Sequence, residues 1–231
     1  MLQLPKVIGH RGAMAYALEN TVASFREASK RGATWIEIDV KLTSDGVPVV
    51  MHDESLQRTM GVDRLVAEMR RAELPRDVPT FEETIALCAE LGLGCNVEIK
   101  PCPGREAETG RVAVETLRRH WPRNSPPPLL SSFKDAALVA ARDAAPEYAR
   151  ALLVGELKDD WQMRAMAVDA AGINVGRRKL TAAGAVAIKR AGYALAVWTV
   201  NDPDEAKALV GMGADCIITD APDVVLKALA S

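Results

Sequence analysis

Residues 7–40 read VIGHRGAMAYALENTVASFREASKRGATWIEIDV, and they contain the unit that decides the fold. A short apolar run, Lys6–Gly9, precedes an amphipathic stretch, Thr21–Arg31, and a second apolar run follows at Trp35–Val40. This order of periodicities predicts a strand, a helix and a second strand. Gly32 follows the helical stretch, as a helix C-terminal glycine does. The region therefore predicts a βαβ unit, in which a helix connects two parallel strands.

The same alternation continues to the end of the chain. Further strands are predicted at Cys95–Lys100, Leu129–Ser132, Arg150–Val154, Ile173–Val175, Ala194–Val200 and Cys216–Thr219. Further helices are predicted at Phe81–Leu91, Arg105–His120, Lys134–Ala144, Asp159–Ala171, Thr181–Arg190, Pro203–Met212 and Pro222–Leu229. Eight strands alternating with eight helices predict an α/β fold, a single (β/α)8 TIM barrel over residues 1–231. A doubly wound open sheet would have fewer units, and no GxGxxG or P-loop supports it.

Several residues mark the predicted helix boundaries. Asn20 is the predicted N-cap of the first helix, and Thr80 and Glu83 have the spacing of a capping box. Pro203 and Pro222 stand at first-turn positions, where a missing backbone N–H costs nothing. These signals support the predicted order of elements.

The composition narrows the classes of function. The 231 residues are 48% hydrophobic and 26% charged, and the formal net charge of −2 argues against non-specific nucleic-acid binding. No apolar run approaches the roughly 20 residues of a membrane span, and the first residues do not resemble a signal peptide. We therefore expect a cytoplasmic protein without stable membrane association. The four cysteines form no CxxC pair, so we expect all four to be reduced.

Ionisable residues gather at the predicted strand ends, where TIM barrels carry their chemistry. The first strand ends at His10 and Arg11. The second carries Glu37 and Asp39 two residues apart, so both side chains share one face. The third strand repeats this spacing with Glu98 and Lys100.

Three carboxylates that converge inside a barrel repel one another and lose hydration, and a bound cation relieves both costs. Glu37, Asp39 and Glu98 are hard oxygen ligands without a nearby His or Cys cluster, so they predict one Mg²⁺ or Ca²⁺. The alternative is a buried ion-pair network in which Lys100 and Arg11 neutralise the three acids.

A hairpin is predicted directly after the second strand. Ser44-Asp45-Gly46 is a tight-turn signal between two extended runs. Pairing around Asp45 makes partner residue numbers sum to about ninety, which returns His52 to the level of Ile38. The hairpin therefore brings a second histidine beside the carboxylates. His10 and His52 are candidates for general acid and base, and Arg11 and Lys100 suit phosphoryl oxygens. His120 ends a helix and is expected to be structural.

Several short motifs, in this order and at these spacings, resemble the glycerophosphodiester phosphodiesterase family of bacterial cytoplasmic type. They are HRG (10–12), ENT (19–21), ExD (37–39), DG (45–46), HD (52–53), ExK (98–100), SF (132–133), WTVN (198–201) and TDxP (219–222). The resemblance runs from Ile8 to about Asp223. It implies a TIM barrel with a β-hairpin and a small insertion, about 54–79, at the C-terminal face.

The resemblance also implies an activity. One divalent cation would lie on Glu37, Asp39 and Glu98, and His10 and His52 would be the acid–base pair. Arg11 and Lys100 would hold phosphate oxygens. The implied reaction is hydrolysis of small-molecule glycerophosphodiesters to glycerol 3-phosphate and an alcohol, in the usual family proposal through a cyclic phosphate. The short, charged insertion leaves the preferred alcohol open.

Two other functions compete with this interpretation. One is a related phospholipase-D-like enzyme that acts on lysophospholipids, and the other is a non-catalytic phosphate-binding barrel. Trp198 fits two positions equally well, filling the barrel or lining its mouth as an apolar wall for the glycerol carbons. Arg177 and Arg178 are expected to cover a solvated face, and Asn174 has no predicted role. The sequence does not indicate an oligomeric state.

Overall fold

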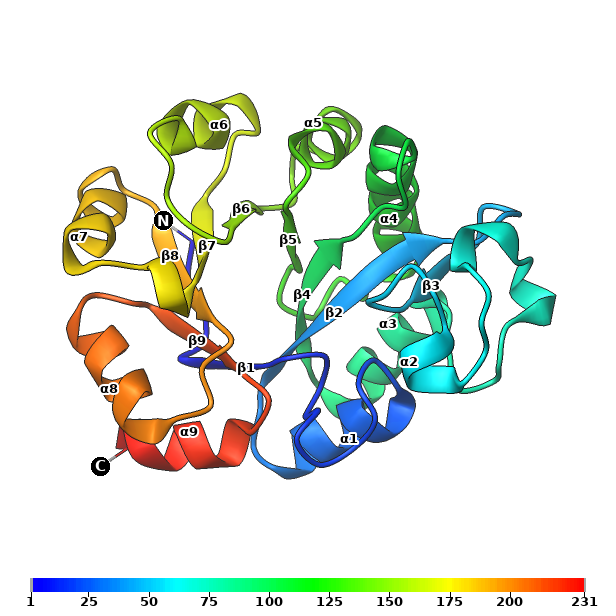
Figure 1. Cartoon of the computed structure of the whole chain (residues 1–231), viewed down its shortest axis with the longest axis horizontal. Coiled ribbons are helices and arrows are strands. Elements are labelled where there is room, and N and C mark those ends of the chain that lie inside the picture. The colour runs from blue at the N-terminus through cyan, green and yellow to red at the C-terminus, as the bar shows by residue number, and fades with distance from the viewer. Residues whose placement is uncertain (1, 231) are drawn as a thin grey trace.

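A closed ring of eight parallel strands with helices outside it forms the body of the molecule (Figure 1). The computed structural model describes residues 2–230. Each strand of the ring pairs with its neighbours, and β1 pairs with both β2 and β9, which closes the barrel. The predicted TIM barrel is therefore confirmed, and the extra strand β3 lies outside the ring, antiparallel to β2.

The strands are β1 (Val7–Gly9), β2 (Trp35–Leu42), β3 (Pro48–Val50), β4 (Gly94–Ile99), β5 (Leu129–Ser132), β6 (Arg150–Val154), β7 (Gly172–Gly176), β8 (Ala194–Trp198) and β9 (Cys216–Thr219). The helices are α1 (Val22–Lys30), α2 (Gln57–Met60), α3 (Phe81–Leu91), α4 (Glu106–His120), α5 (Asp135–Ala144), α6 (Trp161–Ala167), α7 (Ala182–Arg190), α8 (Pro203–Gly211) and α9 (Pro222–Ala230). Short 3₁₀ turns are η1 (Val66–Glu68), η2 (Arg71–Glu73) and η3 (Arg177–Lys179).

The alternation of side chains along β2 separates the apolar core from the charged mouth. Ile36, Ile38 and Val40 are fully buried against the surrounding helices, in a cluster that includes Phe25 of α1 and Phe81 of α3. The residues between them, at positions 37 and 39, must then point into the barrel. Burying apolar area on the outer face stabilises the strand at about 25 cal/mol per Å², which fixes the inward direction of the acids.

The β2–β3 hairpin has the predicted register. Val40 pairs with Val50, Lys41 with Val49 and Leu42 with Pro48, so partner numbers sum to ninety. The Met51 N–H then donates to the Asp39 carbonyl at 2.9 Å, and His52 follows at the level of Ile38. The hairpin thus carries His52 back to the barrel mouth.

Residues 54–79 extend beyond the hairpin, and they occupy the right-hand edge of Figure 1. This segment contains α2, η1 and η2, and it has a small apolar cluster of its own. Leu56, Val66 and Val78 are fully buried there with Val49 of β3. The cluster anchors the segment to the hairpin that carries His52.

Some predicted boundaries change. Thr21, not Asn20, caps α1, because its hydroxyl accepts from the Ser24 N–H, whereas Asn20 has a φ of 56° and turns its side chain inward. The helix predicted at Asp159–Ala171 is shorter, since α6 covers only Trp161–Ala167. The Thr80 capping box and the first-turn Pro203 are confirmed.

All four cysteines are buried and free. Among residues 2–230, no helix is long and apolar enough to cross a membrane.

Candidate active site

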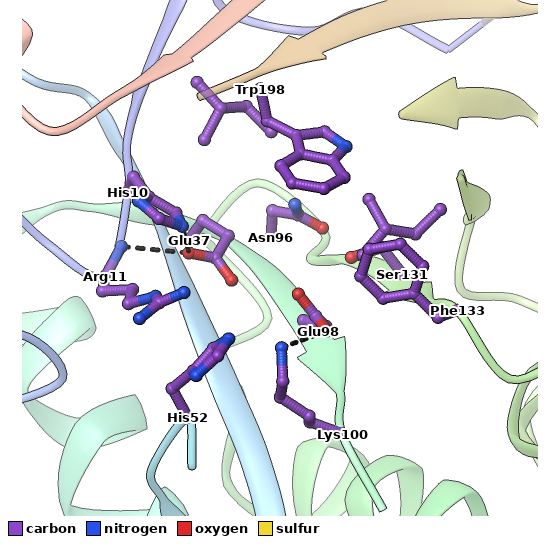
Figure 2. Close-up of a pocket in the computed structure, with 12 residues that line it drawn as sticks. His10, Arg11, Glu37, His52, Asn96, Glu98, Lys100, Ser131, Phe133 and Trp198 are labelled. Carbon is purple, nitrogen blue, oxygen red and sulfur yellow. Dashed lines mark hydrogen bonds and ion pairs between the residues drawn. The ribbon is translucent and has the colours of Figure 1, made fainter. Parts of the chain in front are cut away.

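The predicted site residues converge at the C-terminal mouth of the barrel. A pocket of about 200 Å³ is lined by seven of them, namely His10, Arg11, Glu37, His52, Glu98, Lys100 and Trp198 (Figure 2). The eighth, Asp39, is fully buried beside the pocket. They come from β1, β2, β4, β8 and the segment that follows β3, so only closure of the barrel brings them together.

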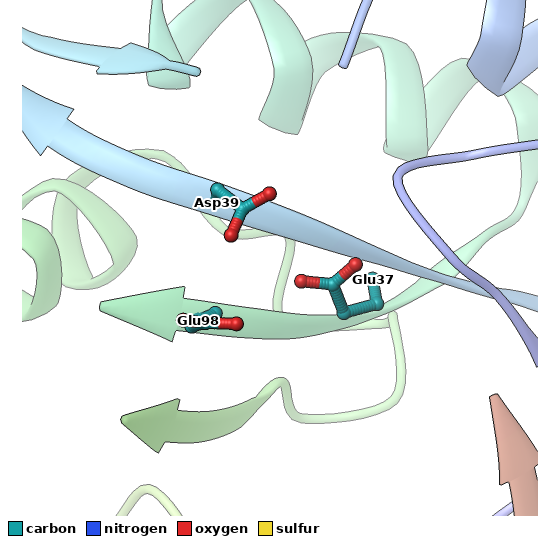
Figure 3. Close-up of side chains that lie close together, drawn as sticks. All are labelled: Glu37, Asp39 and Glu98. Carbon is teal, nitrogen blue, oxygen red and sulfur yellow. The ribbon is translucent and has the colours of Figure 1, made fainter. Parts of the chain in front are cut away.

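Glu37, Asp39 and Glu98 form a compact carboxylate cluster (Figure 3). β2 and β4 are paired in parallel, and Asp39 lies opposite Glu98 in their register. One oxygen of each acid lies within 4.8 Å of the other two. Two full negative charges at that spacing repel by about 3–4 kcal/mol per pair at an effective dielectric constant of about 20. The cluster therefore needs compensation by positive charge or by protons.

The three acids respond differently to this environment. Burial and the charge of Asp39 hold the pKa of Glu37 well above its usual range and raise that of Glu98 to about 7. Burial would also raise the pKa of Asp39, but Lys100 and Arg11 bring it below its usual range. Without a cation, Asp39 is thus ionised, Glu37 favours the protonated form, and Glu98 exchanges its proton near pH 7.

The cluster suits a hard divalent cation. The Glu37 Oε1 atom is buried, and no described residue gives it a hydrogen bond. A buried polar atom without a partner is costly unless a ligand completes it. Three carboxylate oxygens are a donor set for Mg²⁺ or Ca²⁺, with water at the remaining positions. The residues present therefore fit such an ion.

His10 is oriented by a network from the far end of the chain. Its Nδ1 atom lies 2.7 Å from Oδ1 of Asp220. Asp220 also accepts from the Asn201 amide at 2.6 Å, and Thr219 donates to Asn201 at 2.9 Å. Burial would raise the pKa of Asp220, but its hydrogen bonds with His10 and Asn201 lower it. An ionised carboxylate can only accept, so Nδ1 carries the proton and Nε2 is the free nitrogen, 3.9 Å from Glu37.

His52 has a matching partner in the next residue. Its Nδ1 atom lies 2.6 Å from Oδ1 of Asp53, whose pKa is lowered to about 2, mainly by its hydrogen bond with Arg58. The same argument leaves Nε2 of His52 free. Burial lowers the pKa of His52, which favours the neutral ring. Lys41 donates to the His52 carbonyl at 2.9 Å, which helps to fix the backbone of His52.

The two predicted cations are held among acids. Arg11 donates to Glu19 at 2.7 Å, and its Nε atom lies 3.4 Å from Asp39. Lys100 Nζ lies 2.9 Å from Glu98 and 3.2 Å from Asp39. The Arg11 backbone is left-handed, with a φ of 51°, which lets its N–H donate to Glu37 at 3.0 Å. Backbone strain of this kind is common where function fixes geometry.

Gly12 makes this tight loop possible. Its φ is +90°, and a Cβ there would lie 2.3 Å from the Ser24 hydroxyl oxygen. Any larger residue would push the loop away from α1. The glycine of the HRG motif therefore positions Arg11.

The opposite wall of the pocket is apolar. Trp198 and Phe133 meet edge to face, with ring centroids 5.6 Å apart. Of the two positions considered for Trp198, the structure has the one at the mouth. Its Nε1 atom, the Asn96 Oδ1 atom and the Ser131 hydroxyl lack hydrogen-bond partners within residues 2–230, and all three residues line the pocket. They offer polar groups to a hydroxylated ligand.

Sequence reasoning gave no role in the site to several residues that complete it. Asn20 donates to Asp39 at 2.8 Å, and Arg58 donates to Glu19 at 2.7 and 2.8 Å. Glu19, Asn20, Asp53, Asn201 and Asp220 all lie within the short motifs quoted from the sequence. Their partners are distant in sequence, so the motifs marked them without revealing their contacts. Asn174 is buried, and its amide has no hydrogen-bond partner among the described residues.

Comparisons with known proteins agree with this geometry. The family model described as the glycerophosphoryl diester phosphodiesterase family matches residues 10–224. A phosphodiesterase from Oleispira antarctica, solved with the product sn-glycerol-3-phosphate, is 38% identical with a TM-score of 0.95, over 99% of this chain and 98% of that one.

Two further relatives extend the comparison. A glycerophosphodiester phosphodiesterase from Caldanaerobacter subterraneus is 28% identical over 95% of this chain and 96% of its own length. The structure of another from Parabacteroides distasonis is 27% identical with a TM-score of 0.81, over 97% of this chain and 96% of that one. The chain therefore belongs to the glycerophosphoryl diester phosphodiesterase family of enzymes.

Proposed function

We propose that the protein hydrolyses glycerophosphodiesters to glycerol 3-phosphate and an alcohol, with a divalent cation and two histidines. The observation that carries the proposal is the convergence of three buried carboxylates with two histidines whose free Nε2 atoms belong to one pocket. The product bound to the relative from Oleispira antarctica supports the choice of substrate.

Glu37, Asp39 and Glu98 would hold the cation, with Asn20 fixing the Asp39 carboxylate. When bound, Mg²⁺ or Ca²⁺ supplies positive charge that stabilises negative charge developing on phosphoryl oxygens. Arg11 and Lys100 add two further positive groups at the same place. Arg11 can offer paired donors to a phosphate, whereas Lys100 acts as a point charge.

His10 and His52 divide the proton transfers. Displacement at phosphorus removes a proton from the attacking hydroxyl and gives one to the leaving alkoxide, on opposite sides of the phosphorus. His10 extends from the end of β1 and His52 from the hairpin, so they approach the pocket from different elements (Figure 2). Each ring keeps its proton on Nδ1 toward a carboxylate and presents Nε2 to the pocket, as either role requires.

The substrate skeleton would lie against the aromatic wall. Trp198 and Phe133 cover carbon atoms, while the unpartnered groups of Asn96, Ser131 and Trp198 are available to the glycerol hydroxyls. A buried polar group that gains a partner only from the correct substrate contributes to specificity.

The test is an assay of glycerol 3-phosphate release from a panel of glycerophosphodiesters, with added Mg²⁺ or Ca²⁺ and with EDTA. We expect turnover that EDTA abolishes and that either cation restores. Full activity after exhaustive chelation would contradict the role of the carboxylates. Choline release from lysophosphatidylcholine that is faster than from glycerophosphocholine would favour the phospholipase-D-like alternative. Failure to turn over any diester would favour a binding barrel.

A further inference from the structure

A second hollow adjoins the pocket over the ends of β6, β7 and β8. Trp198 lines both the pocket and a cavity of about 500 Å³, and Phe133 lines both the pocket and a cavity of about 450 Å³. Gly155 and Lys179 are common to the two outer cavities. The outer cavities therefore form one cleft, which we call the outer cleft, and the aromatic pair separates it from the catalytic groups.

Positive charge dominates the outer cleft, although its lining also includes the acid Glu156 and an arginine, Arg164, that is paired with Asp135. Arg177, Arg178 and Lys179 lie on its β7 side, and Lys158 lies on its β6 side. Arg177 is held by Glu205 at 2.8 Å, and Lys179 lies 3.7 Å from Glu156. Arg178 and Lys158 are exposed, and neither has an ion pair within residues 2–230.

The backbone places these cations beside the cleft. The turn Arg177–Lys179 follows β7 directly, and Gly176 packs against the loop after β6. A Cβ at Gly176 would lie 2.7 Å from the Gly155 carbonyl oxygen. The two loops therefore approach too closely for a side chain at this point. Arg177 and Arg178 were expected to cover a solvated face, and Arg178 is exposed, but both line the cleft.

The inner pocket is small. Its volume of about 200 Å³ is below the roughly 300–1,000 Å³ of sites that enclose a drug-sized ligand. A diester with its phosphate at the catalytic groups has room to extend one half beyond them, because the outer cleft adjoins the pocket through both aromatic rings. Glycerol is neutral, so the two cations without an ion pair in the described chain, Arg178 and Lys158, gain nothing from it. They stabilise a substrate only if the alcohol half lies there and carries negative charge.

We propose that the outer cleft binds the alcohol half of the substrate and favours alcohols that bear an acidic group, such as a carboxylate or a further phosphate. This inference rests on the proposed hydrolysis of glycerophosphodiesters. Arg178 and Lys158 are the residues that discriminate, because no acid of the described chain neutralises them. A solvated charge pair contributes modestly, so the preference is graded and sensitive to salt.

Glycerophosphoserine and glycerophosphoethanolamine provide a matched test, because they differ only by one carboxylate. With the cation-loaded enzyme, we expect a higher kcat/KM for the serine diester. Arg178→Gln should lower that kcat/KM about fivefold, mainly through KM, and leave the ethanolamine diester within about twofold. The double variant Arg178→Gln/Lys158→Gln should lose more kcat/KM for the serine diester than Arg178→Gln does. Raising the salt concentration should reduce the difference in kcat/KM between the two diesters.

Arg190→Gln is the control, because Arg190 is an exposed arginine at the end of α7 that lines neither the pocket nor the outer cleft. This variant should leave kcat/KM unchanged for both diesters. Equal losses on both diesters in Arg178→Gln, or no loss on either, would overturn the inference while the proposed function stands. Absence of hydrolysis of both diesters by the cation-loaded parent enzyme would instead reject the proposed function.

Discussion

The two sides of the barrel mouth are built in opposite ways. On the side of β1, β2 and β4, which we call the locked side, the charged groups are held by one another. Asp39, for example, contacts Asn20, Arg11 and Lys100. On the side of β6–β8, Arg178 and Lys158 stand without an ion pair in the described chain, beside the aromatic wall. Catalytic groups must be fixed, because a small displacement of a charged group lowers the reaction rate strongly. Charged groups that only select among substrates tolerate a looser arrangement.

The largest loss of activity should come from a substitution at the centre of the locked side. Asp39→Asn keeps the shape of the side chain but removes the carboxylate that stays ionised without a cation. We expect diester hydrolysis to fall below detection and cation binding, measured by calorimetry, to weaken strongly. Thermal unfolding should remain cooperative, which separates a lost site from a lost fold. Near-parental activity of this variant would mean that the three acids form only an ion-pair network.

The histidines come next. His10→Ala and His52→Ala should each lower kcat by about 10²–10⁴-fold, the usual contribution of positioned acid–base catalysis. A nitrophenyl diester of glycerol phosphate has a leaving group that needs little acid help. It should therefore rescue the variant that lacks the acid and not the one that lacks the base. Rescue of both variants to the same extent, or of neither, would contradict the division of roles.

Arg11→Lys tests whether geometry or charge matters on the locked side. The substitution keeps one positive charge but loses the planar pair of donors that suits a phosphate. We expect kcat/KM to fall about 10–100-fold, which corresponds to the loss of one charge-assisted hydrogen bond or somewhat more. Lys30→Arg, on the exposed end of α1, is the control for a change between the two cation types. If Arg11→Lys matched the parent enzyme, Arg11 would be only a counter-ion to the acids.

A smaller effect is expected on the aromatic wall. Trp198→Phe keeps an aromatic ring at the mouth but removes the Nε1–H donor, which has no partner in the part of the chain that the structure describes. We expect kcat/KM to fall about 2–10-fold, since one neutral hydrogen bond is lost. Trp121→Phe is a matched control, because its Nε1 donates to Pro126 away from the pocket. An unchanged kcat/KM in Trp198→Phe would show that no substrate group uses the indole N–H.

The smallest effect concerns stability and pH on the locked side. Burial and Asp39 raise the pKa of Glu98 from 4.5 to about 7, so in this window the folded protein keeps a proton that the unfolded chain has released. The stability of the cation-free protein should therefore fall as pH rises through the window, and a bound cation should reverse this loss.

The Tm gained on adding Mg²⁺ or Ca²⁺ should then be about 2–4 °C larger at pH 8 than at pH 6. Differential scanning calorimetry at both pH values measures it. Asp39→Asn, which should bind the cation weakly, is the control and should gain little at either pH. A larger gain in Tm at pH 6 than at pH 8 would contradict the raised pKa of Glu98.

Local patterns were sufficient to predict the barrel and the positions of its charged residues. Period-two alternation predicted that Glu37 and Asp39 share the inner face of β2, and the turn at Asp45 predicted the hairpin register. These features depend on residues close in sequence, which is why the sequence by itself determined them. The motifs also marked His10 and His52 as site residues.

Only the tertiary structure decided how these residues are held. Asp220 meets His10 from 210 residues away, and Asn20 turns from its expected capping position to bind Asp39. The choice between the two positions of Trp198, and the placement of Arg178 beside the cleft, likewise depend on how β6, β7 and β8 pack at the mouth. A hydrogen bond or a cavity between distant segments has no local signature, because it exists only after the barrel closes.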